Sequence, residues 1–308
     1  MEGAKRFNAI AIAAALFSGG CGGTLPGPGP GAGQQVQTDT GTLMYMTDST
    51  TEEVHVYTYP GGVLQQSLQD DFKSLGSECV DAKGDVFVTD QSGTDIVEYA
   101  HGGSLPISTL QDPDNYPFAC AVDPTSGNLA VANAGYYGGS GGGDIVLYAH
   151  ARGGIKETYT DKQINRMSFC AYDNRGNLFV DGEYGNSSGS PLFAELLHGT
   201  KTFVTLKLDH QFSTPGPMQW DGTYLDIADQ RDTTIYRFAI SGPKGTTKAA
   251  VRLQGAQWLD QFWIDGSRVG AAALINHGSG AIWPFPDGGH PIKKIKPVYF
   301  PLGAVVSK

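Results

Sequence analysis

Three histidines recur at equivalent points of the chain and are the first candidates for chemistry. The segments "IVEYAHGG" (96–103) and "IVLYAHARGG" (145–154) both end an apolar run in Tyr-Ala-His, and "AELLHGT" (194–200) follows the same course. Imidazole is a common zinc ligand, and a catalytic zinc site takes three protein ligands that lie close together. His101, His150 and His198 would supply such a set if the fold gathered them. The alternative, which the repeat favours, is that each histidine caps or solvates its own peripheral turn.

Acidic residues form a second repeated set. Some begin short polar turns (Asp81, Asp123, Asp173, Asp221 and Asp265), and others end apolar strands (Asp48, Asp90, Asn133 and Asp229). Short acceptors at such positions bond backbone N–H groups of the turn. Carboxylates that reached a common cavity could instead hold a divalent metal. The sequence has no Cys-x-x-Cys or His-Glu-x-x-His motif, so the turn role is favoured and no metal ligand is assigned.

The elements that carry these residues repeat along the chain. The segments "CVDAKGDVFVTD" (79–90), "CAVDPTSGNLAVAN" (120–133) and "CAYDNRGNLFVDG" (170–182) each predict a strand, a turn that Asp begins, and a second strand. Looser copies occupy 218–229 and 263–276. A third strand follows, and then a fourth short strand, as in 106–111 and 202–208. The residues near the ends of the third strands are 42 to 49 positions apart: Tyr57, Tyr99, Tyr148, Leu196, Phe238 and Phe285. Four strands in a period of this length are typical of a β-propeller blade.

Second strands of this pattern occur six times, but the first copy lacks a first strand. The C-terminal "FPLGAVVSK" (300–308) resembles "YPFACAVDP" (116–124), which opens the third copy. We therefore expect the C-terminus to supply the inner strand of blade one, which would remove two open sheet edges. The prediction is an all-β protein: one six-bladed propeller over residues 42–308, with the ring closed by the C-terminal strand.

The repeat resembles NHL-type six-bladed propellers over this whole domain, with "GDVFVTDQSGTDIVEYA" (84–100) as a good match. The resemblance implies a fold that hosts both enzymes and binding modules. We expect a binding or scaffold module with no cofactor. The alternative is a hydrolase or lyase of the gluconolactonase or streptogramin-lyase type, with a divalent metal in the central channel. Neither family's site residues can be matched here, so enzymatic activity is left open.

The first 20 residues are predicted to be a signal peptide. Lys5 and Arg6 precede the apolar "FNAIAIAAALF" (7–17) and the small residues "SGGC" (18–21), the order of a secretory signal. Its end resembles a bacterial lipoprotein lipobox, which implies acylation of Cys21; the alternative is an ordinary secretory signal. Residues 21–41 would then be the lipid-anchor cysteine and a flexible Gly/Pro linker. By the same resemblance, Gly22 implies an exported protein at the outer membrane or cell surface.

Charge and cysteines narrow the expected partners and compartment. The chain has 31 acidic and 21 basic residues and no basic cluster, so no nucleic-acid partner is expected, and the membrane would be contacted only through the anchor. By strand parity, Cys79 and Cys120 could face each other across one blade gap, whereas Cys120 and Cys170 share a parity and could not. A Cys79–Cys120 disulfide is therefore possible, and three free thiols are the alternative.

The predicted binding surface is the rim that carries the long connections, between fourth and first strands and between second and third strands. Long loops on a rigid scaffold are common places for ligand contacts. We expect a protein, peptide or small-molecule ligand there, and the alternative is that the rings pack between blades. The opposite rim has tight turns and offers less to a ligand. The candidate residues of the ligand-binding face are Tyr116, Phe118, Tyr136, Tyr137, Tyr184, Phe212 and Trp258.

Overall fold

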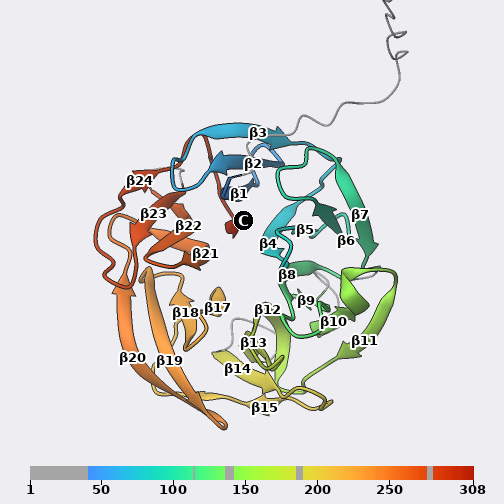
Figure 1. Ribbon diagram of the computed structural model, residues 1–308. Helices are drawn as coiled ribbons and strands as arrows, with labels where there is room; N and C mark the ends of the chain where they lie inside the picture. The colour runs from blue at the N-terminus through green and yellow to red at the C-terminus, as the bar shows by residue number, and fades with distance from the viewer. Residues whose placement is uncertain (1–40, 114, 136–141, 185–189, 276–279) are drawn as a thin grey trace, which may run out of the picture. The chain divides into compact units, whose positions relative to one another are not determined.

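The computed structural model describes residues 41–113, 115–135, 142–184, 190–275 and 280–308. Six mainly antiparallel sheets stand around a common axis like blades, with one strand of each sheet beside the axis (Figure 1). This confirms the predicted six-bladed β-propeller. The described residues contain one short 3-10 helix, η1 (Ala149–Ala151), and in this part of the chain no helix is long and apolar enough to cross a bilayer.

The blades follow one another along the chain, and the strands of each blade are named from the inner strand outward. Blade one contains β25 (Val305–Ser307), β1 (Leu43–Asp48), β2 (Glu53–Thr58) and β3 (Leu64–Leu68). Blade two contains β4 (Leu75–Val80), β5 (Val86–Asp90), β6 (Asp95–Tyr99) and β7 (Pro106–Gln111). Blade three contains β8 (Pro117–Val122), β9 (Leu129–Asn133), β10 (Asp144–Tyr148) and β11 (Ile155–Tyr159).

The other three blades repeat this order with one exception. Blade four contains β12 (Ile164–Tyr172), β13 (Leu178–Tyr184), β14 (Pro191–Leu196) and β15 (Val204–Thr205). Blade five contains β17 (Met218–Trp220), β18 (Leu225–Asp229), β19 (Thr234–Ser241), β20 (Lys244–Arg252) and a fifth strand, β16 (Lys207–Leu208). Blade six contains β21 (Trp258–Asp265), β22 (Arg268–Leu274), β23 (Ala281–Pro284) and β24 (Lys293–Lys294).

The C-terminal strand closes the ring, as the sequence predicts. β25 pairs antiparallel with β1, with Leu43 opposite Ser307 and Tyr45 opposite Val305. The segment before β25 is also held, because the Asp48 carboxylate accepts hydrogen bonds from the backbone N–H groups of Tyr299 (2.6 Å) and Phe300 (3.0 Å). Blade one is therefore assembled from both ends of the propeller (Figure 1).

One strand prediction needs correction. The sequence suggests a single fourth strand for blade four over residues 202–208, but this segment is divided between two blades. β15 pairs with β14, and β16 pairs in parallel with the start of β20 in blade five. The physical reason is the length of β20: its outer edge at Lys244 and Gly245 is covered by the passing chain, while Leu206 between the two short strands is buried.

Four of the five aspartates that begin turns bond the backbone of their own turn, which is the role that the sequence favours, whereas Asp265 pairs with Lys308 (2.6 Å). The Asp81 carboxylate accepts hydrogen bonds from Lys83 N–H (2.8 Å) and Asp85 N–H (3.0 Å). Asp123, Asp173 and Asp221 accept equivalent bonds at the first turns of their own blades. These four carboxylates therefore accept hydrogen bonds from backbone N–H groups, each within its own turn.

Two rims result from this topology. The hairpin rim carries the turns between first and second strands, which are 81–85, 123–128, 173–177, 221–224 and 266–267, and also the turns between third and fourth strands. The long-loop rim carries the remaining connections, including 69–74, 160–163 and 209–217. Inner strands run from the long-loop rim to the hairpin rim, and second strands run back.

Candidate functional site

A cavity of about 220 Å³ lies on the propeller axis between the inner strands. Five of these strands line it, namely β4, β8, β12, β17 and β21. Its wall includes Pro124 and Asn174, which belong to the turns of the hairpin rim. The cavity therefore reaches the hairpin rim, which the sequence analysis regards as the poorer surface for a ligand.

Five half-buried side chains surround this end of the cavity: Val80, Val122, Tyr172, Trp220 and Trp263. We call them the channel mouth. The first four are the last residues of their inner strands, directly before the aspartates that begin the turns. Because the strand fixes the backbone and the following turn is capped, these side chains are held in place without a long loop. A rigid, partly exposed aromatic surface of this kind loses little conformational entropy when it binds a ligand.

Sulfur atoms line the cavity further in. Cys79 and Cys120, the pair that strand parity allows, form a disulfide that joins the inner strands of blades two and three. Cys170 is a free thiol and is buried, and burial raises its pKa. The disulfide fixes β4 against β8, while Cys170 contributes an uncharged wall.

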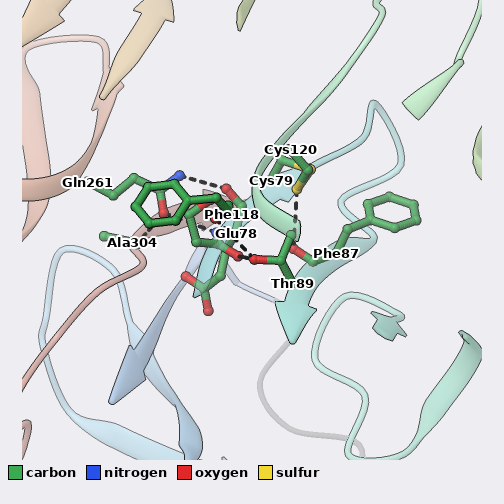
Figure 2. Close-up of a disulfide and its surroundings, with 9 residues drawn as sticks. Glu78, Cys79, Phe87, Thr89, Phe118, Cys120, Gln261 and Ala304 are labelled. Atoms are coloured by element: carbon green, nitrogen blue, oxygen red, sulfur yellow. Dashed lines mark hydrogen bonds between the residues drawn. A yellow bond between two sulfur atoms is a disulfide. The ribbon is translucent and has the colours of Figure 1, made fainter. Parts of the chain in front are cut away.

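Two glutamine side chains connect the inner strands of different blades: Gln261 of blade six reaches Glu78 of blade two, and Gln219 of blade five reaches Ile264 of blade six. Gln261 Oε1 accepts hydrogen bonds from Glu78 N–H (3.1 Å) and Ala304 N–H (2.9 Å), and its Nε2 donates to the Glu78 carbonyl (2.6 Å; Figure 2). Gln219 contacts Ile264 in the same way: its Oε1 accepts from the Ile264 N–H (2.6 Å), and its Nε2 donates to the Ile264 carbonyl (3.3 Å). Each amide thus pairs with both backbone groups of one residue, as a neighbouring strand would.

Glu78 carries a buried carboxyl at the point where blades one, two and six meet. Its backbone is held by Gln261, and its side chain extends away from the disulfide (Figure 2). Both carboxyl oxygens are buried without a hydrogen-bond partner, and a Cβ at Gly303 would lie 3.1 Å from Oε2. Burial raises the pKa of this carboxyl well above its usual range. Burial therefore disfavours the charged form of Glu78.

Three further cavities lie on the hairpin rim and adjoin the channel mouth. The one between blades two and three, of about 510 Å³, shares Val80, Val122, Pro124 and Trp263 with the central cavity. The one between blades three and four, of about 320 Å³, shares Tyr172. The one between blades four and five, of about 350 Å³, shares Asn174 and Trp220. The hairpin rim is therefore concave around the mouth over blades two to five.

The groove between blades two and three is the most charged part of this surface. It is lined by Asp81, Glu98 and Asp123 on the acidic side and by Lys83 and Arg152 on the basic side. Burial, together with the negative charge of Asp85, raises the pKa of Glu98. Opposite charges are mixed in the groove, whereas the wall of the central cavity beside it includes one acidic residue, Glu78, and no lysine or arginine.

The three histidines are not brought together. They occupy the third-to-fourth turns of blades two, three and four. His101 Nδ1 lies 2.6 Å from Ser307 Oγ, and His150 Nδ1 lies 2.8 Å from the Ser126 carbonyl. The His198 N–H donates to Asn177 Oδ1 (2.9 Å). Each histidine is therefore a turn residue, and within the described ranges no three His, Cys, Asp or Glu side chains are grouped so that they could hold a metal ion.

The aromatic residues predicted to form a ligand-binding face on the long-loop rim are less exposed than expected where the structure describes them. Phe212 is only 8% exposed and packs against Phe193 and Phe238, so its ring belongs to the core. Phe118 is half-buried, with its ring edge-on to Phe169 at 5.2 Å.

Two other members, Tyr116 and Trp258, are half-buried, and the Trp258 indole donates to Asp260 Oδ1 (2.8 Å). Tyr136, Tyr137 and the side chain of Tyr184 lie outside the described residues. The positions that reasoning from the sequence missed are those of the channel mouth and the two glutamines. A signal for the mouth was present, because bulky residues directly precede the turn aspartates.

Comparison with known proteins supports the fold and extends no further. No family model matches the chain, and no curated protein matches it. Among solved structures, a chain of the Nidogen/Laminin complex is similar, with a TM-score of 0.69, 13% identity, and coverage of 87% of this chain and 99% of that one. A protein of unknown function from Bacteroides caccae is similar with a TM-score of 0.65, 11% identity and the same coverage. At these identities the similarity establishes the propeller fold alone.

Proposed function

We propose that this protein is an exported, membrane-tethered binding module whose ligand contacts the hairpin rim around the channel mouth. The observation that carries the proposal is the concave surface formed by the central cavity and the three grooves that share its wall residues. Concave sites with apolar and aromatic walls and a few polar groups are the usual form of ligand pockets. The ligand is a protein, a peptide or a small molecule.

Two further observations support this function. The structurally similar chain of the Nidogen/Laminin complex belongs to a protein–protein assembly, and its propeller fold is the one seen here. The Cys79–Cys120 disulfide suits an oxidising compartment outside the cytosol, as does the predicted signal peptide. The long-loop rim, with Tyr136 and Tyr137, stays a prediction as a second surface.

Blocking the channel mouth tests the binding role. Asn174 is an exposed turn residue in the wall of the cavity, so Asn174→Trp should fill the mouth without disturbing a strand. We expect any ligand found in a thermal-shift screen of the full chain to bind this variant at least tenfold more weakly. Thr223→Trp is the matched control, because Thr223 is an exposed turn residue of the next blade outside the cavity wall. A ligand that binds all three proteins equally would argue against the hairpin rim.

Replacement of the proposed lipid-bearing cysteine tests the tether. Cys21→Ser removes the thioether and with it the acyl chains, and each buried CH₂ of such chains contributes about 0.8 kcal/mol to membrane affinity. We expect the variant to move from the membrane fraction to the soluble extracytoplasmic fraction in cell fractionation. Cys170→Ala is the control, since this thiol lies in the propeller and should leave the fractionation unchanged. Membrane association of the Cys21→Ser protein would refute the tether and leave the binding role untouched.

A further inference from the structure

The inner strands leave backbone groups open toward the axis. Each inner strand has a partner on one side only, so every second residue turns its N–H and C=O groups toward the channel. At two places a side-chain amide occupies these groups: Gln261 bonds both groups of Glu78, and Gln219 bonds both groups of Ile264. The protein therefore uses a primary amide, with its donor and acceptor side by side, as the complement of an open inner strand.

The inner strands of blades three and four lack this complement. Residues 119–122 of β8 and 170–172 of β12 line the cavity as consecutive stretches, so their backbone forms part of its wall. Among the residues that the structure describes, no side chain hydrogen-bonds to the backbone of these two stretches. Open strand edges of this kind accept a peptide backbone or another amide, as in β-strand addition.

Charge at the cavity wall excludes an ionic ligand group. The one acidic side chain of the wall is Glu78, whose carboxyl oxygens are buried without a hydrogen-bond partner, and the wall includes no lysine or arginine. An ion that left water for this cavity would lose its hydration without gaining a counter-charge. The mouth adds Tyr172, Trp220 and Trp263, whose rings offer an apolar surface beside the open strand edges.

We infer that the channel mouth binds a short, uncharged peptide segment that carries an apolar side chain. The backbone amide of the segment pairs with the open edges of β8 and β12, in the manner of the two glutamines, and its side chain lies against Trp220 and Trp263. A cavity of about 220 Å³ holds a few residues of a chain and no folded domain. This inference rests on the proposed binding function and specifies the chemistry of its ligand.

The test is a titration of the full chain, purified in detergent, with N-acetyl-leucyl-leucinamide as the probe and tryptophan fluorescence as the readout. We expect saturable binding. The methyl ester, which lacks the terminal amide N–H, should bind about fivefold more weakly, the usual effect of one hydrogen bond. Unblocked leucyl-leucine, which carries two charges, should bind at least tenfold more weakly. Asn174→Trp should abolish binding of the blocked peptide, and Thr223→Trp should leave it unchanged.

Each outcome of this titration decides the inference. Equal affinity for the amide and the ester would overturn the pairing with open strand edges. Absence of binding to the folded wild-type chain at millimolar probe would overturn the peptide assignment. If a neutral disaccharide bound instead and Asn174→Trp removed that binding, the peptide inference would fall while the proposed function would stand. If the blocked peptide bound Asn174→Trp as well as the wild type, the site itself would lie elsewhere.

Discussion

Removal of residues 300–308 should lower the free energy of unfolding by about 5 kcal/mol or more, a large share of the ~5–15 kcal/mol typical of a folded domain. The deletion takes away β25, whose Val305 and Val306 are buried, and each buried valine contributes about 1.5–3 kcal/mol. It also leaves the inner edge of β1 unpaired and takes the Ala304 N–H from Gln261. We expect a broad unfolding transition at much lower temperature.

Calorimetry or circular dichroism of the truncated chain checks this result. A synthetic peptide of residues 300–308, added in excess, should restore part of the melting temperature because it can re-form the pairing with β1. A peptide of the same composition in scrambled order is the control. A truncated protein that melted like the full chain would show that the pairing of β25 with β1 does not hold the ring closed.

Glu78→Gln should stabilise the protein at pH 8 and have little effect at pH 4. The buried Glu78 carboxyl has a pKa raised well above 4.5, so the folded protein holds this proton more tightly than the unfolded chain does. Between the unfolded pKa and the folded pKa, the free energy of unfolding falls by about 1.4 kcal/mol for each pH unit. Below about pH 4.5 the Glu78 carboxyl is protonated in the folded and in the unfolded chain, so this loss of unfolding free energy disappears. Glutamine is neutral at every pH and removes this dependence.

Urea unfolding at pH 4, 6 and 8 measures the effect as a difference that widens with pH. Glu157→Gln is the control, because Glu157 lies on the exposed outer strand β11 and the Tyr159 hydroxyl lowers its pKa. That variant should show no gain at pH 8. Parallel pH profiles for the wild type and Glu78→Gln would mean that the carboxyl ionises without cost and is not buried in solution.

Much of the fold could be predicted from the sequence because its signals are local and repeated. Each blade carries an aspartate turn and alternating apolar residues, so the six copies and the closure by residues 300–308 can be read from the period. The parity of Cys79 and Cys120 follows from strand geometry alone. The division of residues 202–208 between two blades could not be predicted, because the parallel pairing of Lys207 with Lys244 depends on how adjacent blades approach each other.

The candidate site was harder to predict, because the length of a loop does not indicate whether its side chains line a cavity. Phe212 lies in a long connection, yet it is buried among Phe193 and Phe238. Trp220 precedes a short turn, yet it borders two cavities. Which aromatic ring faces a cavity depends on the tilt of the inner strands around the axis. That tilt cannot be predicted from the residue pattern of a single sequence.

The direction of β1 has a consequence for access to the mouth. As a second strand, β1 starts at the hairpin rim, so the chain before Leu43 joins the propeller at the same edge as the channel mouth. If Cys21 carries a lipid as proposed, the 20 residues from 22 to 41 reach at most about 70 Å. The linker would then confine the channel mouth to the space within that distance of the bilayer surface. Ligands attached to that bilayer would meet it at a high effective concentration, whereas freely diffusing ligands would gain nothing from the tether.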